Sequence, residues 1–202
     1  FKTNEMKVED YRANDSFRIE NHQATFPNVI TIEEAEKKLK KNRKKLSEIQ
    51  DKMYAHDKYS VLICFQGMDT AGKDSLIREV FKNFNARGVE VQSFKTPTSK
   101  EYQHDYLWRH YIALPEKGKF GVFNRTHYEN VLVSRVHPEY VLNEKLPKIN
   151  TVSDLDEAFW ENRFTEINNF EKHLTENGTI IFKFFLNIDK ERSIIYPQKI
   201  AS

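Results

Sequence analysis

The residues best placed to do chemistry form a glycine-bearing loop at 67–73, which reads GMDTAGK and fits the G-x-x-x-x-G-K pattern. Glycines let successive backbone N–H groups curl round a phosphate, and the helix start that follows adds N–H donors and a positive dipole end. Lys73 would supply a mobile cation for a phosphoryl group in transfer. The pattern therefore predicts a phosphate-binding loop. The alternative is an ordinary strand-to-helix turn with a solvated Lys73.

Two acidic residues set this loop apart from the usual ATPase form. Position 74 is Asp, where such loops carry the Ser or Thr that holds Mg²⁺, and a hydroxyl follows only at Ser75. Asp69 lies inside the loop, where an anion would face phosphates. A divalent cation between that carboxylate and the phosphate oxygens removes the repulsion, so we expect Asp69 to bind Mg²⁺. The other residues expected to line the phosphate are Gly67, Met68, Thr70, Ala71, Gly72, Asp74 and Ser75.

The composition of the chain bounds its class. Its 202 residues are 39% hydrophobic, which suits one domain with a single core. The net charge of +2 gives no global nucleic-acid signature, so nucleic acid is not an expected partner. The lone Cys64 rules out an intrachain disulfide and, with no signal peptide apparent, favours a cytoplasmic setting. No apolar run approaches the ~18 residues that span a bilayer, so no membrane partner is expected.

Strand-like segments recur on both sides of the loop. An apolar run at 61–65 precedes it, and further strands are expected at 89–94, 119–123 and 179–186. The last of these is mostly apolar, as in the centre of a parallel sheet. Because strands alternate with helical patterns, we expect a parallel α/β sheet covered on both faces. Residues 1–30 are polar and aperiodic and are expected to form an N-terminal arm, with the domain itself spanning 31–202.

The segments between the strands favour helices. Thr31 with Glu34 forms a capping-box pattern that opens the first helix. That helix carries a run of basic residues from Lys37 to Lys45, which predicts a solvated face or, alternatively, a wall for a polyanion. In an aromatic-rich helix opened by Ser99, Asp105 and Arg109 are spaced for an ion pair or for substrate contacts. The expected helices span about 31–55, 76–84, 100–114, 129–136 and 153–176.

Polar residues follow the third expected strand directly. Asn124, Arg125 and Glu129 come after the apolar run 119–123. Ligands of open α/β sheets collect at the carboxyl ends of the strands, beside the phosphate loop. These three residues are therefore site candidates. The alternative is that Asn124 or Thr126 merely caps the next helix and that Arg125 is solvated.

Four stretches taken together resemble the second family of polyphosphate kinases. They read GMDTAGKD, SFKTPTSKEYQHDYLWR, FGVFNRTHYENVLVSRVHP and FKFFL, and the resemblance covers about Ala35 to Lys190. It implies a three-layer α/β/α P-loop kinase fold and assembly into homodimers or homotetramers. The activity it implies is Mg²⁺-dependent, reversible phosphoryl transfer between inorganic polyphosphate and nucleoside mono- or diphosphates.

The resemblance also assigns roles to residues. Lys73 and its loop would grip phosphate, and Asp69 would hold the metal or position the acceptor phosphate. Arg135 would be a basic residue on the phosphate path. The family's second motif corresponds to Asn124, Arg125 and Glu129. Catalysis is expected to rest on Asp69, Lys73 and Arg125. The NRTHYE form of the second motif is similar to the subgroup that accepts both nucleoside mono- and diphosphates, which makes ADP, AMP and GDP candidate acceptors.

The sequence departs from the family after the strand at 179–186. There the family has an arginine-bearing helical lid, whereas this sequence passes through DKER at 189–192 and stops at Ser202. The lid segment is therefore expected to be either missing or unobserved after about residue 190. Two other functions stay open: an ATP-dependent nucleoside or nucleotide kinase, and a P-loop module that holds nucleotide or polyphosphate without turnover.

Overall fold

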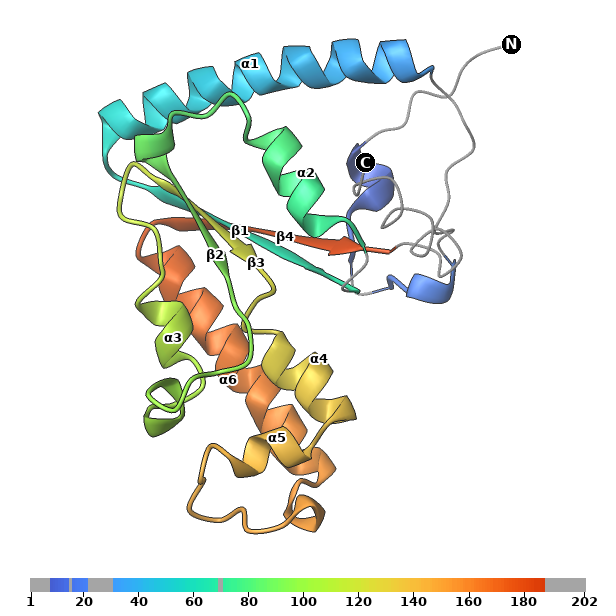
Figure 1. Ribbon diagram of the computed structural model, residues 1–202, viewed down its shortest axis with the longest axis vertical. Helices are drawn as coiled ribbons and strands as arrows, with labels where there is room; N and C mark the ends of the chain where they lie inside the picture. Colours follow the sequence, from blue (N-terminus) through green and yellow to red (C-terminus); the bar gives the residue numbers. More distant parts are fainter. Residues whose placement is uncertain (1–7, 15, 22–30, 69–70, 188–202) are drawn as a thin grey trace, which may run out of the picture.

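A parallel sheet forms the centre of the computed structural model, which describes residues 8–14, 16–21, 31–68 and 71–187 (Figure 1). The sheet has four strands in these residues, in the order β2-β3-β1-β4. All neighbouring pairs run parallel, so the strands end at one common edge. The strands are β1 (Ser60–Gly67), β2 (Val89–Ser93), β3 (Phe120–Asn124) and β4 (Thr179–Leu186).

Helices cover both faces of this sheet. On one face α1 (Ile32–His56) and α2 (Lys73–Val80) lie over the strands, and on the other lie α3 (Trp108–Tyr111) and α6 (Glu157–Glu176) (Figure 1). Alternate residues of β1 serve the two layers, since Ile63 packs in the core beside α2 and Cys64 in the core beside α6. The expected three-layer α/β/α fold is therefore confirmed.

The remaining elements are short. Two helices, α4 (Glu129–Val136) and α5 (Glu139–Leu142), follow β3. The 3₁₀ turns lie at Val8–Tyr11, Ile19–Asn21, Ala86–Gly88, Glu101–Gln103 and Val152–Asp154. Among the residues that the structure describes, no helix is both long and apolar enough to cross a membrane. Most of the expected arm at 1–30, and the segment after 187, lie outside the described residues.

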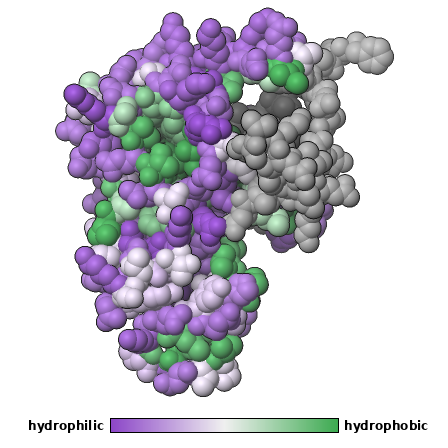
Figure 2. Space-filling view, in the orientation of Figure 1, coloured by the Kyte–Doolittle hydropathy of each residue, from purple (hydrophilic) through white to green (hydrophobic). Residues whose placement is uncertain are grey.

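The first helix begins as the sequence predicts. Thr31 Oγ1 accepts the backbone N–H of Glu34, and the Glu34 carboxylate accepts that of Thr31 at 2.9 Å. Figure 2 shows a hydrophilic surface along α1. The inner side of α1 is fixed by buried Gln50, which exchanges two hydrogen bonds with the backbone of Asn85. A Cβ at Gly88 would lie 2.4 Å from the Gln50 amide nitrogen, so a larger residue there would displace the Gln50 side chain from these hydrogen bonds.

The helix expected over 100–114 is wrong. The structure instead has a 3₁₀ turn at 101–103 and the four-residue α3. The interruption has a local cause, because the Asp105 carboxylate accepts the backbone N–H of Leu107 at 2.9 Å and so offers the chain a turn in place of a helix. Arg109 does not bond Asp105. It lies 3.3 Å from the Glu101 carboxylate and donates to the carbonyl of Lys95 at 2.8 Å.

The strand at 179–186 is expected at the centre of the sheet, but it has one strand neighbour, β1, among the described residues. Within the part of the chain that the structure describes, β4 lies at the end of the strand order. Its apolar side chains Ile180, Phe182 and Phe184 are therefore half-exposed, although Phe184 stacks on Phe65 of β1 at 5.4 Å. Apolar composition indicates a strand but does not encode which neighbours it pairs with.

Candidate active site

The loop between β1 and α2 has the backbone shape that its glycines suggest. Gly67 has a φ of +152°, and a Cβ there would lie 2.9 Å from the carbonyl oxygen of Leu186. Gly72 has a φ of +75° and precedes the first residue of α2. The N–H of Ala71 donates to the carbonyl of Met68 at 2.9 Å, closing the turn. Asp69 and Thr70, both predicted site residues, lie outside the described residues.

Lys73 lies inside this loop. It is the first residue of α2, only 5% exposed, and its ammonium group donates to the carbonyls of Gly67 and Met68 at 2.7 Å each. The alternative of a solvated lysine is therefore wrong. A phosphate oxygen is a stronger partner for an ammonium group than a neutral carbonyl. The arrangement thus holds Lys73 close to where a phosphate in the loop would lie.

The end of β3 contacts the start of α2. Asn124 is 7% exposed, and its amide nitrogen donates to the carboxylate of Asp74 at 2.6 Å and to the hydroxyl of Ser93 at 3.2 Å. The alternative that Asn124 merely caps the next helix is wrong, since its side chain contacts α2 instead. The Thr126 hydroxyl does accept the backbone N–H of Tyr128, just before α4, at 3.1 Å. Ser75 follows Asp74 in the first turn of α2 and is partly buried. Three elements therefore converge on Asn124.

Arg125 has an unusual backbone. Its φ of +59° lies in the left-handed region, which is unfavourable for a residue with a side chain. Its N–H donates to the carbonyl of Phe65 at 3.2 Å, and the hydroxyl of the next residue, Thr126, donates to the side-chain oxygen of Gln66 at 3.1 Å. The Gln66 amide nitrogen donates to the carboxylate of Glu129. The segment after β3 is thus tied to β1 at several points.

A cleft of about 270 Å³ opens at this edge of the sheet. Arg125 and Glu129 line it together with Arg109, so two of the predicted site residues meet a third polar group there. Phe94, Tyr102 and Tyr140 supply aromatic walls, and the Arg109 guanidinium lies 5.0 Å from the centre of the Phe94 ring. Sequence reasoning missed Phe94, although the rule that ligands gather where strands end applies equally to the residue after β2.

Arg135 has an acidic partner instead of facing the cleft. It lies in the last turn of α4. The residues of α4 that line the cleft are Glu129, Asn130, Val133 and Ser134. Its guanidinium is 2.6 Å from both carboxylate oxygens of Glu157 on α6. Both side chains are about half-exposed. The structure therefore brings the other described candidates together at the strand ends and places Arg135 against α6.

Comparison with known proteins decides the family. The family model described as polyphosphate kinase 2 matches residues 30–195. The chain belongs to the polyphosphate kinase 2 family. It is 46% identical over 147 residues to the ADP-polyphosphate phosphotransferase of Rhodopseudomonas palustris, covering 73% of this chain and 50% of that protein. It is 41% identical over 148 residues to the AMP/ADP-polyphosphate phosphotransferase of Meiothermus ruber, with the same coverage of 73% and 50%.

Solved structures agree with this assignment. The polyphosphate kinase 2 of Arthrobacter aurescens TC1 superposes with a TM-score of 0.80 at 32% identity, over 95% of this chain and 65% of that chain. A putative polyphosphate kinase 2 of Pseudomonas aeruginosa gives a TM-score of 0.71 at 27% identity, covering 84% and 34% of the two chains. The chain spans about half the length of the curated relatives named above.

A divalent cation fits the side chains of this polyphosphate kinase 2 site. The side-chain oxygen of Asn124 is buried and has no hydrogen-bond partner among the described residues, and the amide nitrogen of the same side chain donates to the Asp74 carboxylate. Mg²⁺ prefers hard oxygen ligands and is usually held by one or two carboxylates together with substrate phosphates and water. No cluster of three or more metal-binding side chains occurs in the described ranges. Asp74 and Asn124 therefore suit a cation that also binds phosphate oxygens.

Proposed function

We propose that this chain catalyses the Mg²⁺-dependent, reversible transfer of the terminal phosphoryl group of inorganic polyphosphate to a nucleoside mono- or diphosphate. The observation that carries the proposal is that Lys73 in the phosphate loop and Arg125 in the cleft lie at the same edge of the sheet. Asn124 contacts Asp74 in the first turn of α2, beside Lys73, and the next residue, Arg125, lines the cleft. A donor phosphate in the loop and an acceptor phosphate in the cleft would thus meet near Asn124.

The chemistry is a direct displacement. An oxygen of the acceptor's terminal phosphate forms a bond to the phosphorus in transfer, while the bond from that phosphorus to the rest of the polyphosphate breaks. The polyphosphate leaves one unit shorter and keeps the electron pair of the broken bond. Such transfer needs positioning and neutralisation of charge more than covalent help from the protein, and we expect no phosphoenzyme.

The chain's own residues meet these needs. Lys73 would bind oxygens of the phosphate in the loop, and Arg125 would neutralise charge on the phosphoryl group in transfer. When bound, Mg²⁺ would neutralise further charge. Asp74 and Asn124 would hold it, together with Asp69 as the sequence predicts. The aromatic walls of the cleft suit a nucleoside, with Arg109 near its phosphates. The names of the relatives support ADP and AMP as acceptors. Assembly into homodimers or homotetramers is proposed on the family resemblance.

A donor and acceptor comparison tests this function. The chain is incubated with Mg²⁺ and either polyphosphate plus AMP, ADP or GDP, or ATP plus a nucleoside. Phosphorylated product in the polyphosphate reactions alone supports the proposal. Product only with ATP and a nucleoside would make the chain an ATP-dependent kinase. Binding of polyphosphate and nucleotide with no product in any reaction would leave a binding module.

Changing Asp69 to Asn is expected to raise the Mg²⁺ concentration for half-maximal activity about tenfold and to lower turnover. The reason is that an anion in an anion-binding loop is stable only with a cation nearby. Activity is titrated against Mg²⁺, and thermal unfolding is measured on the same variant. A shifted Mg²⁺ curve with unchanged unfolding supports metal binding. An unchanged curve with lowered stability would show that Asp69 only ties down the loop.

Arg135 and Glu157 are expected to affect polyphosphate in opposite directions. If Arg135 serves distant phosphates, Arg135→Ala raises the KM for long polyphosphate about two- to fivefold, whereas Glu157→Gln frees the guanidinium and lowers it. The KM for ADP is the internal control and should change less, and both polyphosphate effects should shrink as salt is added. Equal changes for the two substrates, or the same sign in both variants, would make Arg135 a structural arginine that only holds α4 to α6.

A further inference from the structure

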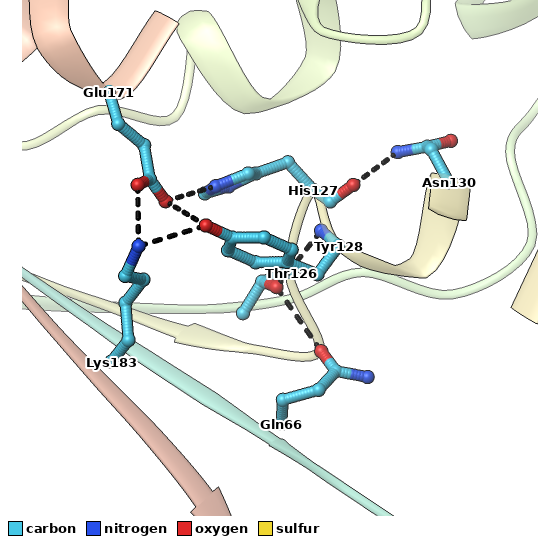
Figure 3. Close-up of polar contacts among 7 residues, drawn as sticks. All are labelled: Gln66, Thr126, His127, Tyr128, Asn130, Glu171 and Lys183. Atoms are coloured by element: carbon cyan, nitrogen blue, oxygen red, sulfur yellow. Dashed lines mark hydrogen bonds and ion pairs between the residues drawn. The ribbon is translucent and has the colours of Figure 1, made fainter. Parts of the chain in front are cut away.

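A buried carboxylate on α6 gathers three side chains around it (Figure 3). One oxygen of Glu171 lies 3.0 Å from the Nε2 atom of His127 and accepts the hydroxyl of Tyr128 at 2.7 Å. Its other oxygen accepts the ammonium group of Lys183 on β4 at 2.7 Å, and Lys183 also donates to the Tyr128 hydroxyl at 2.9 Å. The side chain of Glu171 is 11% exposed and that of His127 is fully buried. The cluster joins α6 and β4 to the segment after β3.

Charge holds this cluster together. Burial by itself would raise the pKa of Glu171, but the hydrogen bonds from His127, Lys183 and Tyr128 outweigh it and lower that pKa to about 2. The same contacts raise the pKa of Lys183 to about 12 against the effect of its own burial. Glu171 and Lys183 therefore stay ionised through the neutral range. The Lys183 side chain is 49% exposed and the Glu171 side chain 11%, so loss of Lys183 would leave a poorly solvated carboxylate, which is unfavourable.

The cluster anchors one end of a strained segment. Arg125 has its left-handed backbone between Asn124, which is held by Asp74, and Thr126, which is held by Gln66. The two residues that follow Thr126 are the ones that contact Glu171 (Figure 3). A strained backbone persists only when its surroundings fix it from several sides. Without the α6 anchor, the segment would be held mainly from β1 and α2.

We infer that Glu171 is a positioning residue for phosphoryl transfer, acting through Tyr128 and His127 to hold Arg125 and Glu129 at the cleft. The inference rests on the proposed function of that cleft. Glu171 lies on α6, which packs on the face of the sheet opposite α2. Its hydrogen bonds are with the segment after β3 and with Lys183 of β4, so its effect on the reaction is indirect. The contact with Glu171 also explains why a lysine interrupts the apolar strand β4, because Lys183 is the counter-ion of Glu171.

Two tyrosine substitutions provide a matched test. Tyr128→Phe removes a hydroxyl that donates to Glu171, and Tyr106→Phe removes one that donates to Glu166 of the same helix at 2.8 Å. Tyr106 lines a different cleft, together with Glu166, and is not part of the segment after β3. Both changes should lower the unfolding temperature by similar amounts. Only Tyr128→Phe should lower kcat, by about tenfold, with KM for ADP changed less than twofold.

A second pair tests the role of charge. Lys183→Met leaves the buried Glu171 carboxylate without its counter-ion and should lower kcat at least as much as Tyr128→Phe. Adding Glu171→Gln to that variant removes the uncompensated charge while the glutamine still accepts from Tyr128. The double variant should therefore regain part of the lost kcat. Equal kcat in Tyr128→Phe and Tyr106→Phe, or no recovery in the double variant, would overturn the inference.

A readout independent of turnover separates this inference from the proposed function. The backbone amide resonance of Arg125 is followed by NMR, with and without inorganic tripolyphosphate, in the wild type and the two tyrosine variants. A shift of that resonance in Tyr128→Phe but not in Tyr106→Phe supports positioning, even if the wild type transfers no phosphoryl group and the proposed function fails. An Arg125 resonance unchanged in both variants would overturn positioning, even if the wild type is active.

Discussion

Changing Lys73 to Ala is expected to lower phosphoryl transfer about 10³-fold, which corresponds to about 4 kcal/mol of transition-state stabilisation. The ammonium group already lies in the loop, 2.7 Å from two of its carbonyls, and a bound phosphate would be its stronger partner. Alanine favours the first turn of a helix, so α2 should persist. Turnover with ADP and polyphosphate is measured beside circular dichroism and thermal unfolding.

Lys82→Ala is the matched control for Lys73→Ala. Lys82 lies just after α2 and is exposed, so its loss changes net charge equally without touching the loop. We expect its turnover to stay within twofold of wild type, since exposed charges at a distance are screened. A folded Lys73→Ala variant that keeps more than about a tenth of wild-type turnover would contradict the phosphate-loop assignment.

Changing Arg125 to Ala or to Gly is expected to lower kcat by about 10² to 10³, because both remove a guanidinium from the phosphoryl group in transfer. The two variants differ in backbone strain. At a φ of +59°, glycine is favoured over alanine, so Arg125→Gly should be the more stable by about 1 kcal/mol. Steady-state kinetics and chemical unfolding are measured on both.

The pair of Arg125 variants separates charge from conformation. If the guanidinium matters, the two variants lose similar activity despite their different stabilities. If Arg125 serves only to shape the backbone, the glycine variant should retain activity that the alanine variant loses. Near-wild-type kcat in Arg125→Gly would therefore remove Arg125 from the reaction and leave its left-handed backbone as a purely structural feature.

The loop and its flanking elements were predictable because their signals are local. Five apolar residues, two glycines and a helical repeat follow one another between Val61 and Val80, and the structure has β1, the loop and α2 in that order. The position of Asn124 and Arg125 at the strand ends also follows from a general rule for parallel sheets. For these two residues to lie beside the phosphate loop, β3 had only to pair with β1, as it does.

What sequence could not supply was the partner of each side chain. In the sequence, Asp74 stands where the Ser or Thr that holds Mg²⁺ is usually found. The hydrogen bond that it accepts from Asn124 depends on how α2 meets β3, 50 residues away. Arg135 looked like part of a cation path, but the packing of α4 on α6 pairs it with Glu157. Glu171 drew no attention because a glutamate in an amphipathic helix is usually solvated.

The sequence holds one indication of the role of Glu171, but it can be recognised only once the fold shows which carboxylate lies beside β4. Lys183 is a lone charge in the apolar run 179–186, and a charge in a strand expected to be buried indicates a counter-ion nearby. The sequence offers many carboxylates that might serve, and only the fold selects one. The helix expected over 100–114 failed for a local reason instead. Asp105 favours a turn, and the helical spacing of the aromatic residues was given more weight than that preference.

The most direct test of the central claim is a phosphate balance followed by ³¹P NMR, with ADP, polyphosphate and Mg²⁺, for the wild type and for Lys73→Ala. A reaction with ADP alone controls for transfer between two nucleotides. We expect the wild type to form one ATP for each phosphate unit lost from polyphosphate chain ends, and the variant to form almost none. ATP formed equally without polyphosphate, or polyphosphate lost as free phosphate with no ATP, would contradict transfer from polyphosphate to nucleotide at this site.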